Sequence, residues 1–445
     1  MIQGIGAFLK SNKNILGIFA ITLLIYLINL PIDYSKSLQT KVPRRLLTSN
    51  DVTSATFLPY EVIKNKTLRF SKSTVDAMQR AQVYEPFVYS VINKNGKFLS
   101  AMPILAGIMA IPIYIIPILL NKIPALQYYK DLVNILTLGR IAASFYTAIS
   151  VAIFFLILKE IDKIKNFKTN AWNYAFVAFF AFGTNVYSIA SRALYQHTSS
   201  LLFVTLIIYF ALKSLKDDNY VKYLGLFAGF LYLARPLNLV FVALLTVYVF
   251  FMHKKEFVKY LLYALPTALL LFAYNIYAWG NPLTTEYVEK SDTSFSTPLI
   301  VGLSGYLFSP ARSFLFVTPP LVVGYFAMIR TFIKRNKEKL DILLITLSAT
   351  FLIVLILYSK WHDWEGGDRF GYGFLTEWVP VMAVLSYIYI KPMKRLGKVI
   401  IGVLMLWSVV VQTNAVWIRK SRCSGASHNW SFYCITPQFF KKQNY

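Results

Sequence analysis

Carboxylates and arginines gather at a few places in a sequence that is otherwise mostly apolar. Asp51 lies in the polar stretch RRLLTSNDVTSATF (residues 44–57), downstream of Arg44 and Arg45. A carboxylate can act as a general base, and cations beside it can neutralise charge that develops on a phosphate. Sugar transfer from a lipid-linked phosphate needs only these two functions, because its leaving group is already an anion. The SND stretch also fits an ordinary helix N-cap.

Two later stretches collect acids, aromatic residues and glycines. Residues 280–312 read GNPLTTEYVEKSDTSFSTPLIVGLSGYLFSPAR, and residues 359–373 read SKWHDWEGGDRFGYG. Arg192, His197 and Arg235 stand apart, near the ends of apolar runs. An ionisable side chain at membrane depth is costly and usually serves a ligand or a pathway. These three residues are therefore site candidates, although a long side chain can also snorkel to the lipid headgroups.

The composition places these stretches in a membrane protein. The 445 residues are 56% hydrophobic and 15% charged, with a mean hydropathy of +0.52, whereas a soluble protein is about 25% charged. The net charge of +26 does not indicate nucleic-acid binding, because the basic residues fall in short loops between apolar runs, where they set orientation and contact anionic lipid. The sequence predicts an all-α polytopic membrane protein.

Eleven apolar runs are candidate membrane spans. They cover residues 15–32, 139–158, 172–190, 199–213, 222–235, 237–252, 258–279, 313–330, 341–358, 374–391 and 398–418. Lysine and arginine cluster in five of the loops between them, around residues 159–168, 213–222, 254–259, 334–339 and 391–395. Such clusters mark cytoplasmic loops. The N-terminus is then cytoplasmic, and the polar stretches and the C-terminal tail (residues 419–445) are external.

The first external loop, residues 33–138, contains a further apolar stretch at residues 100–121. All five basic loops face one side only if this stretch does not cross the membrane, or if a second break compensates. Its prolines, Pro103, Pro112 and Pro117, each remove a helix hydrogen bond. We therefore expect a juxtamembrane or re-entrant segment, and a kinked crossing helix with another span miscounted is the alternative.

The two cysteines of the chain, Cys423 and Cys434, both lie in the predicted external tail. An oxidising exterior favours a disulfide between them, and two free thiols are the alternative.

Motifs that cradle soluble nucleotides or metals are absent from the sequence. It contains no P-loop, no dinucleotide fingerprint after a strand, no zinc-type Cys/His spacing and no Gly-x-Ser-x-Gly elbow. A sugar donor that arrives through the membrane needs no such cradle, so we expect no cofactor.

The chain resembles the bacterial GT-C glycosyltransferases that are similar to protein O-mannosyltransferases and the lipid A aminoarabinose transferase. The resemblance rests on the order and spacing of the stretches SNDVTSATFLPYEVIKNKTLRF, YSVINKNGKFLSAMPILAGIMAIPIYI, SRALYQHTSSLLF, YLARPLNLVF, YNIYAWGNPLTTEY, GLSGYLFSPARSFLFVTPP and YSKWHDWEGGDRFGYGFLTEWVP. It implies one GT-C domain over residues 1–445, with juxtamembrane helices in the first external loop. It also implies a polyprenyl-phosphate sugar donor and an acid in that loop that acts as base.

The resemblance assigns roles to particular residues. Asp51 becomes the base, with Glu61 or Glu85 as the fallback acid. The candidates for contacts with the donor phosphate are Lys360, Arg369, Arg192, His197 and Arg45. The candidates for contacts with the sugar are Trp361, Trp364 and Asp368, although tryptophans at this depth also suit an interfacial aromatic belt. Relatives commonly have an Asp-Glu pair where this chain has Asn50-Asp51, so we expect metal-independent transfer.

Within the family, the size and the short external tail are similar to the serotype-converting glucosyltransferases of bacterial O-antigen. The expected activity is inverting transfer of a hexose-type sugar to an external lipid-linked or surface glycan at the bacterial inner membrane. Three alternatives belong to other classes. A polyprenyl-linked glycan polymerase or ligase would rely on arginines. A transporter or flippase would show inverted repeats and a midplane ionisable site. A non-enzymatic scaffold would not explain the three polar external clusters.

Overall fold

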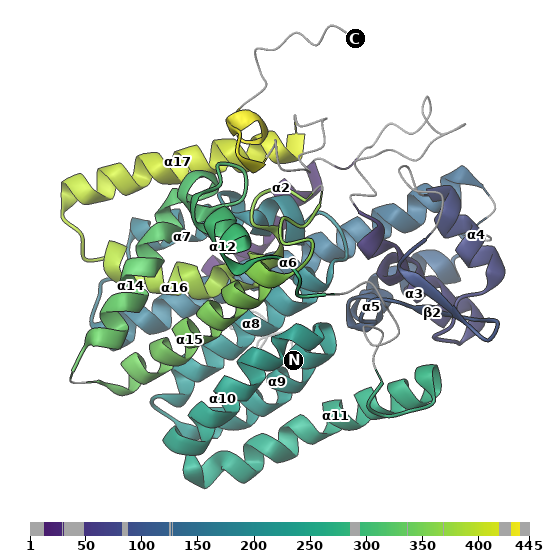
Figure 1. Ribbon diagram of the computed structural model, residues 1–445, viewed down its shortest axis with the longest axis horizontal. Helices are drawn as coiled ribbons and strands as arrows, with labels where there is room; N and C mark the ends of the chain where they lie inside the picture. Colours follow the sequence, from purple (N-terminus) through teal and green to yellow (C-terminus); the bar gives the residue numbers. More distant parts are fainter. Residues whose placement is uncertain are drawn as a thin grey trace, which may run out of the picture.

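The chain folds into a large bundle of helices with a smaller unit at one end (Figure 1). The computed structural model describes residues 13–28, 30, 49–81, 88–123, 126, 128–284, 294–335, 337–367, 369–417 and 429–436. Glu85, Arg45, Asp368 and Cys423 are site or disulfide candidates that lie outside these residues.

Helices make up almost all of the bundle. Its elements are α2 (Lys13–Ile28), α6 (Tyr129–Lys165), α7 (Ala171–Phe182), the π-turn η2 (Val186–Ala190), α8 (Gln196–Ser214), η3 (Asp218–Tyr220), α9 (Val221–Ala234), η4 (Pro236–Asn238), α10 (Leu239–Met252), η5 (Lys254–Glu256), α11 (Phe257–Trp279), α12 (Leu299–Phe308), α13 (Phe314–Val317), η6 (Pro319–Leu321), α14 (Val322–Ile333), α15 (Lys339–Lys360), η7 (Gly373–Trp378), α16 (Val379–Ile390), α17 (Arg395–Trp417) and η8 (Phe432–Cys434).

Their lengths and composition fit a membrane protein. Within the described residues, six helices are long and apolar enough to cross a membrane, and six shorter apolar helices accompany them. Each of the eleven predicted spans coincides with one helix or with consecutive short helices. Many apolar side chains of α11 and α17 face outward, such as Leu262, Leu270, Val403 and Leu406, each at least 58% exposed. The prediction of an all-α polytopic membrane fold is confirmed.

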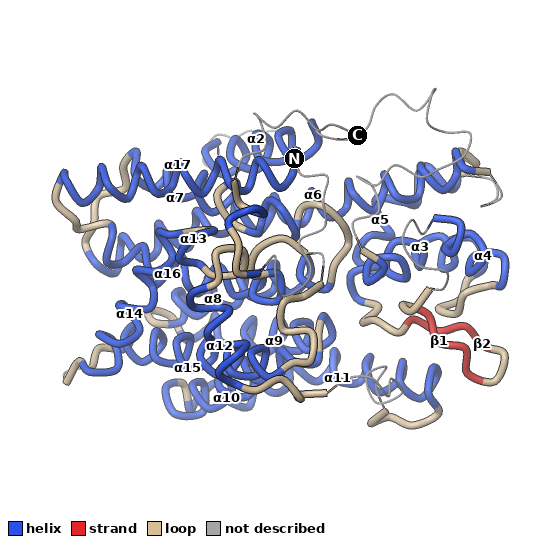
Figure 2. Tube along the Cα trace, turned by 45° about the horizontal axis from the view of Figure 1, so that its top comes forward, coloured by secondary structure: helices blue, strands red, loops and turns tan. Residues whose placement is uncertain are grey.

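The smaller unit, which we call the first-loop unit, comprises residues 50–119. It contains η1 (Asn50–Val52), α3 (Thr53–Asn65), α4 (Lys72–Ala81), the antiparallel strands β1 (Val91–Lys94) and β2 (Lys97–Ser100), and α5 (Leu105–Leu119). The strands appear as the hairpin at the edge of the molecule in Figure 2. Asn95 and Gly96 form its turn in the left-handed region, with φ of 52° and 78°, as a two-residue hairpin turn requires.

The ambiguous stretch at residues 100–121 forms α5, which packs against α3 in the core of the first-loop unit. Gly107 makes this contact possible, because a Cβ there would lie 2.9 Å from the carbonyl oxygen of Ala55. Apolar side chains of α6, including Leu132 and Leu136, complete the same core. This packing is what a juxtamembrane helix would show, and its position relative to the bilayer stays a prediction.

The first-loop unit also contacts the end of α11. The Arg69 guanidinium lies 4.4 Å from the ring centre of Tyr277, and Lys94 Nζ lies 5.6 Å from that of Trp279. Leu99 of β2 is buried against Trp279 and its neighbour on α11. These contacts hold the unit against the C-terminal end of α11.

Candidate active site

Asp51 faces the bundle from the start of the first-loop unit. The hydroxyl oxygen of Ser49 accepts a hydrogen bond from the Asp51 backbone N–H at 3.3 Å, so Ser49 is the cap of η1. The Asp51 carboxylate instead accepts a hydrogen bond from the Tyr89 hydroxyl and forms an ion pair with the Arg369 guanidinium. Its side chain is 12% exposed. Asp51 is therefore not the helix cap: Ser49 has that role, and Asp51 forms an ion pair with Arg369, another predicted site residue.

Arg369 belongs to the loop between α15 and η7, residues 361–372, which we call the Arg369 loop. Its guanidinium carbon lies 4.7 Å from the ring centre of Phe374 and 5.7 Å from that of Tyr195. Burial lowers the pKa of Arg369 to about 10 and the Glu377 carboxylate raises it, so the side chain stays charged at neutral pH. Two aromatic rings and the nearby Asp51 and Glu377 carboxylates therefore stabilise the charged guanidinium.

Part of the Arg369 guanidinium is buried without a partner. Its Nε and Nη1 atoms have no hydrogen-bond partner within the part of the chain that the structure describes. A buried donor that stays unpaired costs free energy, and a phosphate oxygen accepts a strong, charge-assisted hydrogen bond from an arginine N–H. Arg369 therefore has two N–H groups that could donate to an anionic ligand beside Asp51.

A second cluster of charges lies deeper in the bundle. The Glu377 carboxylate, fully buried in η7, accepts from Arg235 Nη1 at 2.7 Å and lies 2.5 Å from His197 Nδ1. Arg235 also lies 5.1 Å from the ring centre of Tyr358 and 5.6 Å from that of Phe374. Arg235 is therefore an internal ion-pair partner, and the alternative that it snorkels to the headgroups does not fit its burial.

The ring of Phe374 joins the two clusters. Its face stacks on Tyr358 at 5.1 Å, while Arg369 and Arg235 both lie within 5.6 Å of its centre. Charges alternate from Asp51 through Arg369 and Glu377 to Arg235. This order keeps each buried charge near an opposite one, as burial of charge requires.

Three predicted contacts with substrate do not fit their surroundings. His197 is 3% exposed and is directed at Glu377, so we assign it to the internal cluster rather than to the donor phosphate. Trp364 is 8% exposed and its ring packs on Gly305, where a Cβ would lie 2.1 Å away, so the indole is a core side chain rather than a sugar platform. Arg192 is buried beside Arg140, whose Nη1 donates to the Arg192 carbonyl at 3.4 Å.

The fallback acid Glu61 has a local structural task. Its fully buried carboxylate accepts hydrogen bonds from the Ser71 backbone N–H at 2.9 Å, the Ser71 hydroxyl at 2.7 Å and Asn65 Nδ2 at 2.5 Å. These bonds fix the chain between α3 and α4. Glu61 is therefore engaged in folding the first-loop unit and is not placed as a base.

Lys360 and Trp361 end α15 beside a neighbouring loop. Lys360 is exposed, and its carbonyl oxygen accepts from the Thr297 N–H at 3.0 Å. Trp361 is partly exposed and meets the Phe295 ring edge-on at 5.3 Å. Both remain candidates for contacts with substrate. In the tail, Cys434 is disulfide-bonded, and its predicted partner Cys423 is outside the described residues.

Glu377, Tyr89 and Arg312 were not predicted as site residues from the sequence. The signal for Glu377 was available, because it is an acid inside an apolar run that was predicted to cross the membrane. Tyr89 gave no signal, since tyrosine is common throughout the chain. Arg312 lay in a polar stretch but had no predicted partner.

Comparisons with known proteins concern the fold. A scan against protein-family models finds no match, and neither does a search of curated proteins. A search of solved structures finds the crystal structure of ArnT from Cupriavidus metallidurans bound to undecaprenyl phosphate, with 11% identity and a TM-score of 0.51. The match covers 92% of this chain and 66% of the ArnT chain, so this chain spans just under two thirds of that protein. The chain therefore has a membrane fold similar to that of ArnT.

Proposed function

We propose that this chain is an inverting glycosyltransferase that moves a hexose-type sugar from a polyprenyl-phosphate donor to an external lipid-linked or surface glycan, such as O-antigen. The observation that carries the proposal is the ion pair between Asp51 and Arg369. It combines a carboxylate with a cation that has two buried donors without a partner among the described residues. ArnT, which has a similar fold, is bound to undecaprenyl phosphate, and this supports a polyprenyl-phosphate partner at the bacterial inner membrane.

In the proposed reaction Asp51 is the general base. The proton of the acceptor hydroxyl moves to the Asp51 carboxylate while the acceptor oxygen forms a bond to the anomeric carbon. The bond from that carbon to the phosphate oxygen breaks, and its electron pair leaves with the phosphate. Attack on the face opposite the phosphate inverts the configuration. Asp51 then releases its proton to water.

Arg369 is the proposed partner of the phosphate. The leaving group gains negative charge as the bond breaks, and a fixed guanidinium in a largely enclosed site stabilises that charge strongly. Donor binding would draw Arg369 towards the phosphate through its Nε and Nη1 atoms. The Tyr89 hydroxyl, which donates to Asp51, would keep the carboxylate oriented after that exchange. Because position 50 is asparagine, we propose that transfer needs no metal.

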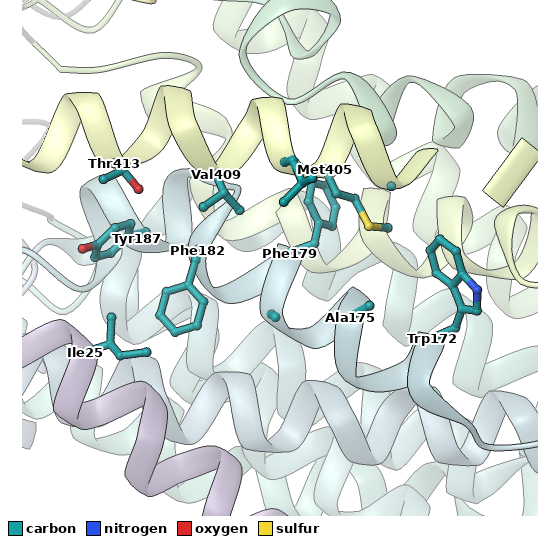
Figure 3. Close-up of a pocket in the computed structure, with 12 residues that line it drawn as sticks. Ile25, Trp172, Ala175, Phe179, Phe182, Tyr187, Met405, Val409 and Thr413 are labelled. Carbon is teal, nitrogen blue, oxygen red and sulfur yellow. The ribbon is translucent and has the colours of Figure 1, made fainter. Parts of the chain in front are cut away.

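An apolar groove supports a lipid donor. The groove, of about 470 Å³, lies between α2, α7 and α17 (Figure 3). At one end are Tyr187 and Thr413. The residue beside Thr413, Gln412, donates to Asn185 at 3.0 Å, and Asn185 Nδ2 donates to the carbonyl oxygen of Phe370 at 2.9 Å. Because these two hydrogen bonds link the end of the groove to the Arg369 loop, we propose that the groove receives the isoprenoid chain of the donor.

A direct test uses purified protein in proteoliposomes with a radiolabelled polyprenyl-phosphate hexose and lipid-linked glycans from the native membrane. A transferase releases polyprenyl phosphate and labels the glycan. A flippase moves the labelled lipid across the bilayer without cleaving it, and a polymerase or ligase joins glycans and leaves the monophosphate donor unchanged. Either of the last two results would overturn the proposal.

A further inference from the structure

Arg312 lies in the turn after α12, and its guanidinium donates hydrogen bonds to the backbone of the Arg369 loop. The side chain is 1% exposed. Its Nη1 donates to the carbonyl oxygens of Arg369 and, at 3.4 Å, Gly371, and its Nη2 donates to that of Gly367 at 2.9 Å. One buried cation thus fixes three peptide groups of the segment that presents Arg369.

The Arg369 loop needs contacts from other parts of the chain to fix its conformation. Gly366, Gly367 and Gly371 all have positive φ, of 73°, 57° and 62°. Glycine has wide backbone freedom in the unfolded and in the folded chain, so three such residues around Arg369 do not define its position by themselves. The hydrogen bond from Arg312 to the Arg369 carbonyl acts on the same residue whose guanidinium meets Asp51.

Asn429, from the C-terminal tail, completes the support. It is 2% exposed, and its Oδ1 accepts from Arg312 Nε at 2.9 Å. Its Nδ2 donates to the Glu365 carboxylate, and its carbonyl oxygen accepts from the Ser309 hydroxyl. The tail is anchored close by, because Cys434 is buried against Ala311, the neighbour of Arg312.

We infer that Arg312 and Asn429 are positioning residues for the Arg369 guanidinium, so that the C-terminal tail sets the affinity of the site for the donor phosphate. This inference rests on the phosphate role of Arg369 in the proposed function. It also implies that Asn429-Trp430-Ser431, which reads as a glycosylation sequon, is not modified in the folded protein, because the Asn429 amide is buried and bonded on both sides.

Double-mutant cycles on full-length protein in detergent test the inference, with undecaprenyl phosphate as the ligand and its dissociation constant as the readout. Asn429→Asp removes the donor to Glu365 and sets two carboxylates against each other, so we expect binding about tenfold weaker. Adding Glu365→Gln restores a donor across the same contact and should bring affinity back to within about threefold. Asn281→Asp, an exposed turn residue whose Oδ1 accepts from Leu283 N–H, is the matched control and should bind normally.

The decisive comparison is in the Arg369→Ala background. If Asn429 acts through Arg369, Asn429→Asp adds less than about twofold there. An equal loss in both backgrounds, or normal binding with only a lower melting temperature, overturns the inference. If Arg369→Ala itself binds undecaprenyl phosphate normally, the phosphate role in the proposed function fails together with this inference. A loss in Arg369→Ala with an additive Asn429→Asp overturns this inference alone.

Discussion

Single residues carry the chemistry of the proposed site, and only some of them were visible in the sequence. Asp51 and Arg369 each lie in a polar stretch of an apolar chain, and the family resemblance implied their roles as base and phosphate ligand. Their contact was not predicted, because 318 positions separate them and nothing in a single sequence pairs such distant charges. His197 was predicted to contact the phosphate for the same reason: a single sequence does not show that its partner is the distant, buried Glu377.

Arg369→Lys tests whether the fork of the guanidinium matters. Lysine keeps the charge but offers one ammonium in place of a planar set of donors, so it cannot satisfy a phosphate at two positions and meet Asp51 as well. We expect kcat/KM for the donor to fall by about 10- to 100-fold, mostly through a higher donor KM. Steady-state transfer assays at varied donor concentration measure this. Unchanged donor KM would contradict the phosphate role.

Glu377→Gln tests the internal cluster as a structural element. Removing one partner of a buried ion pair leaves Arg235 uncompensated and should lower the free energy of unfolding by about 3–5 kcal/mol. Glu160→Gln is the matched control, because its partner Lys163 is 56% exposed and such pairs contribute less than about 1 kcal/mol. Thermal unfolding in detergent, followed by tryptophan emission, compares the two. Equal shifts in melting temperature would contradict the account of the cluster.

At the level of elements, the lengths of the apolar runs predicted the helices well. The residues typical of a hairpin turn were overlooked. Within the described residues, each of the eleven predicted spans is one helix or several consecutive helices, because each is an apolar run; two of them, residues 172–190 and 313–330, are interrupted by bends. The hairpin of β1 and β2 was missed, although Asn95-Gly96 between two short apolar-rich segments is a strong hairpin signal. The prolines of residues 100–121 favoured a juxtamembrane or re-entrant segment over a crossing helix, and α5 forms there with Pro112 and Pro117 inside it.

Gly225→Ala tests how tightly α9 and α11 pack. A Cβ at Gly225 would lie 1.9 Å from the carbonyl oxygen of Tyr260, so the helices must separate, and overpacking of this kind costs about 1–3 kcal/mol. Gly17→Ala on α2 is the control, because nothing lies within 4 Å of its Cβ position and alanine favours helix. We expect a lower melting temperature for the first variant only. A normal melting temperature for Gly225→Ala would show that these helices have room to move.

At the scale of the whole molecule, the described structure consists of a helical bundle, the first-loop unit at its end and an apolar groove between α2, α7 and α17. The sequence predicted the membrane class and the external polar stretches from composition and loop charge. It did not predict the groove, because apolar side chains that line a groove and those that face lipid have the same composition. Only the packing of α2, α7 and α17 distinguishes them.

Val409→Trp tests the groove. The larger side chain would fill part of the space between α7 and α17 and should weaken binding of a polyprenyl phosphate by about tenfold, while a short-chain analogue binds as before. Val247→Trp on α10 is the control, since Val247 is 51% exposed on an apolar helix outside the groove. Equal affinities of the two variants for the long-chain lipid would show that the groove does not hold the donor.

The proposed function depends above all on Asp51 as the base of an external sugar transfer. The most direct measurement is the mass profile of surface glycans from cells that lack this protein and are complemented with wild type, Asp51→Asn or Asp76→Asn at equal membrane abundance. Asp76 is an exposed residue of α4 in the same unit, so its variant controls for loss of charge. We predict that wild type and Asp76→Asn restore one hexose-sized increment, and that Asp51→Asn reduces it by about 100-fold or more. Full restoration by Asp51→Asn would contradict the account.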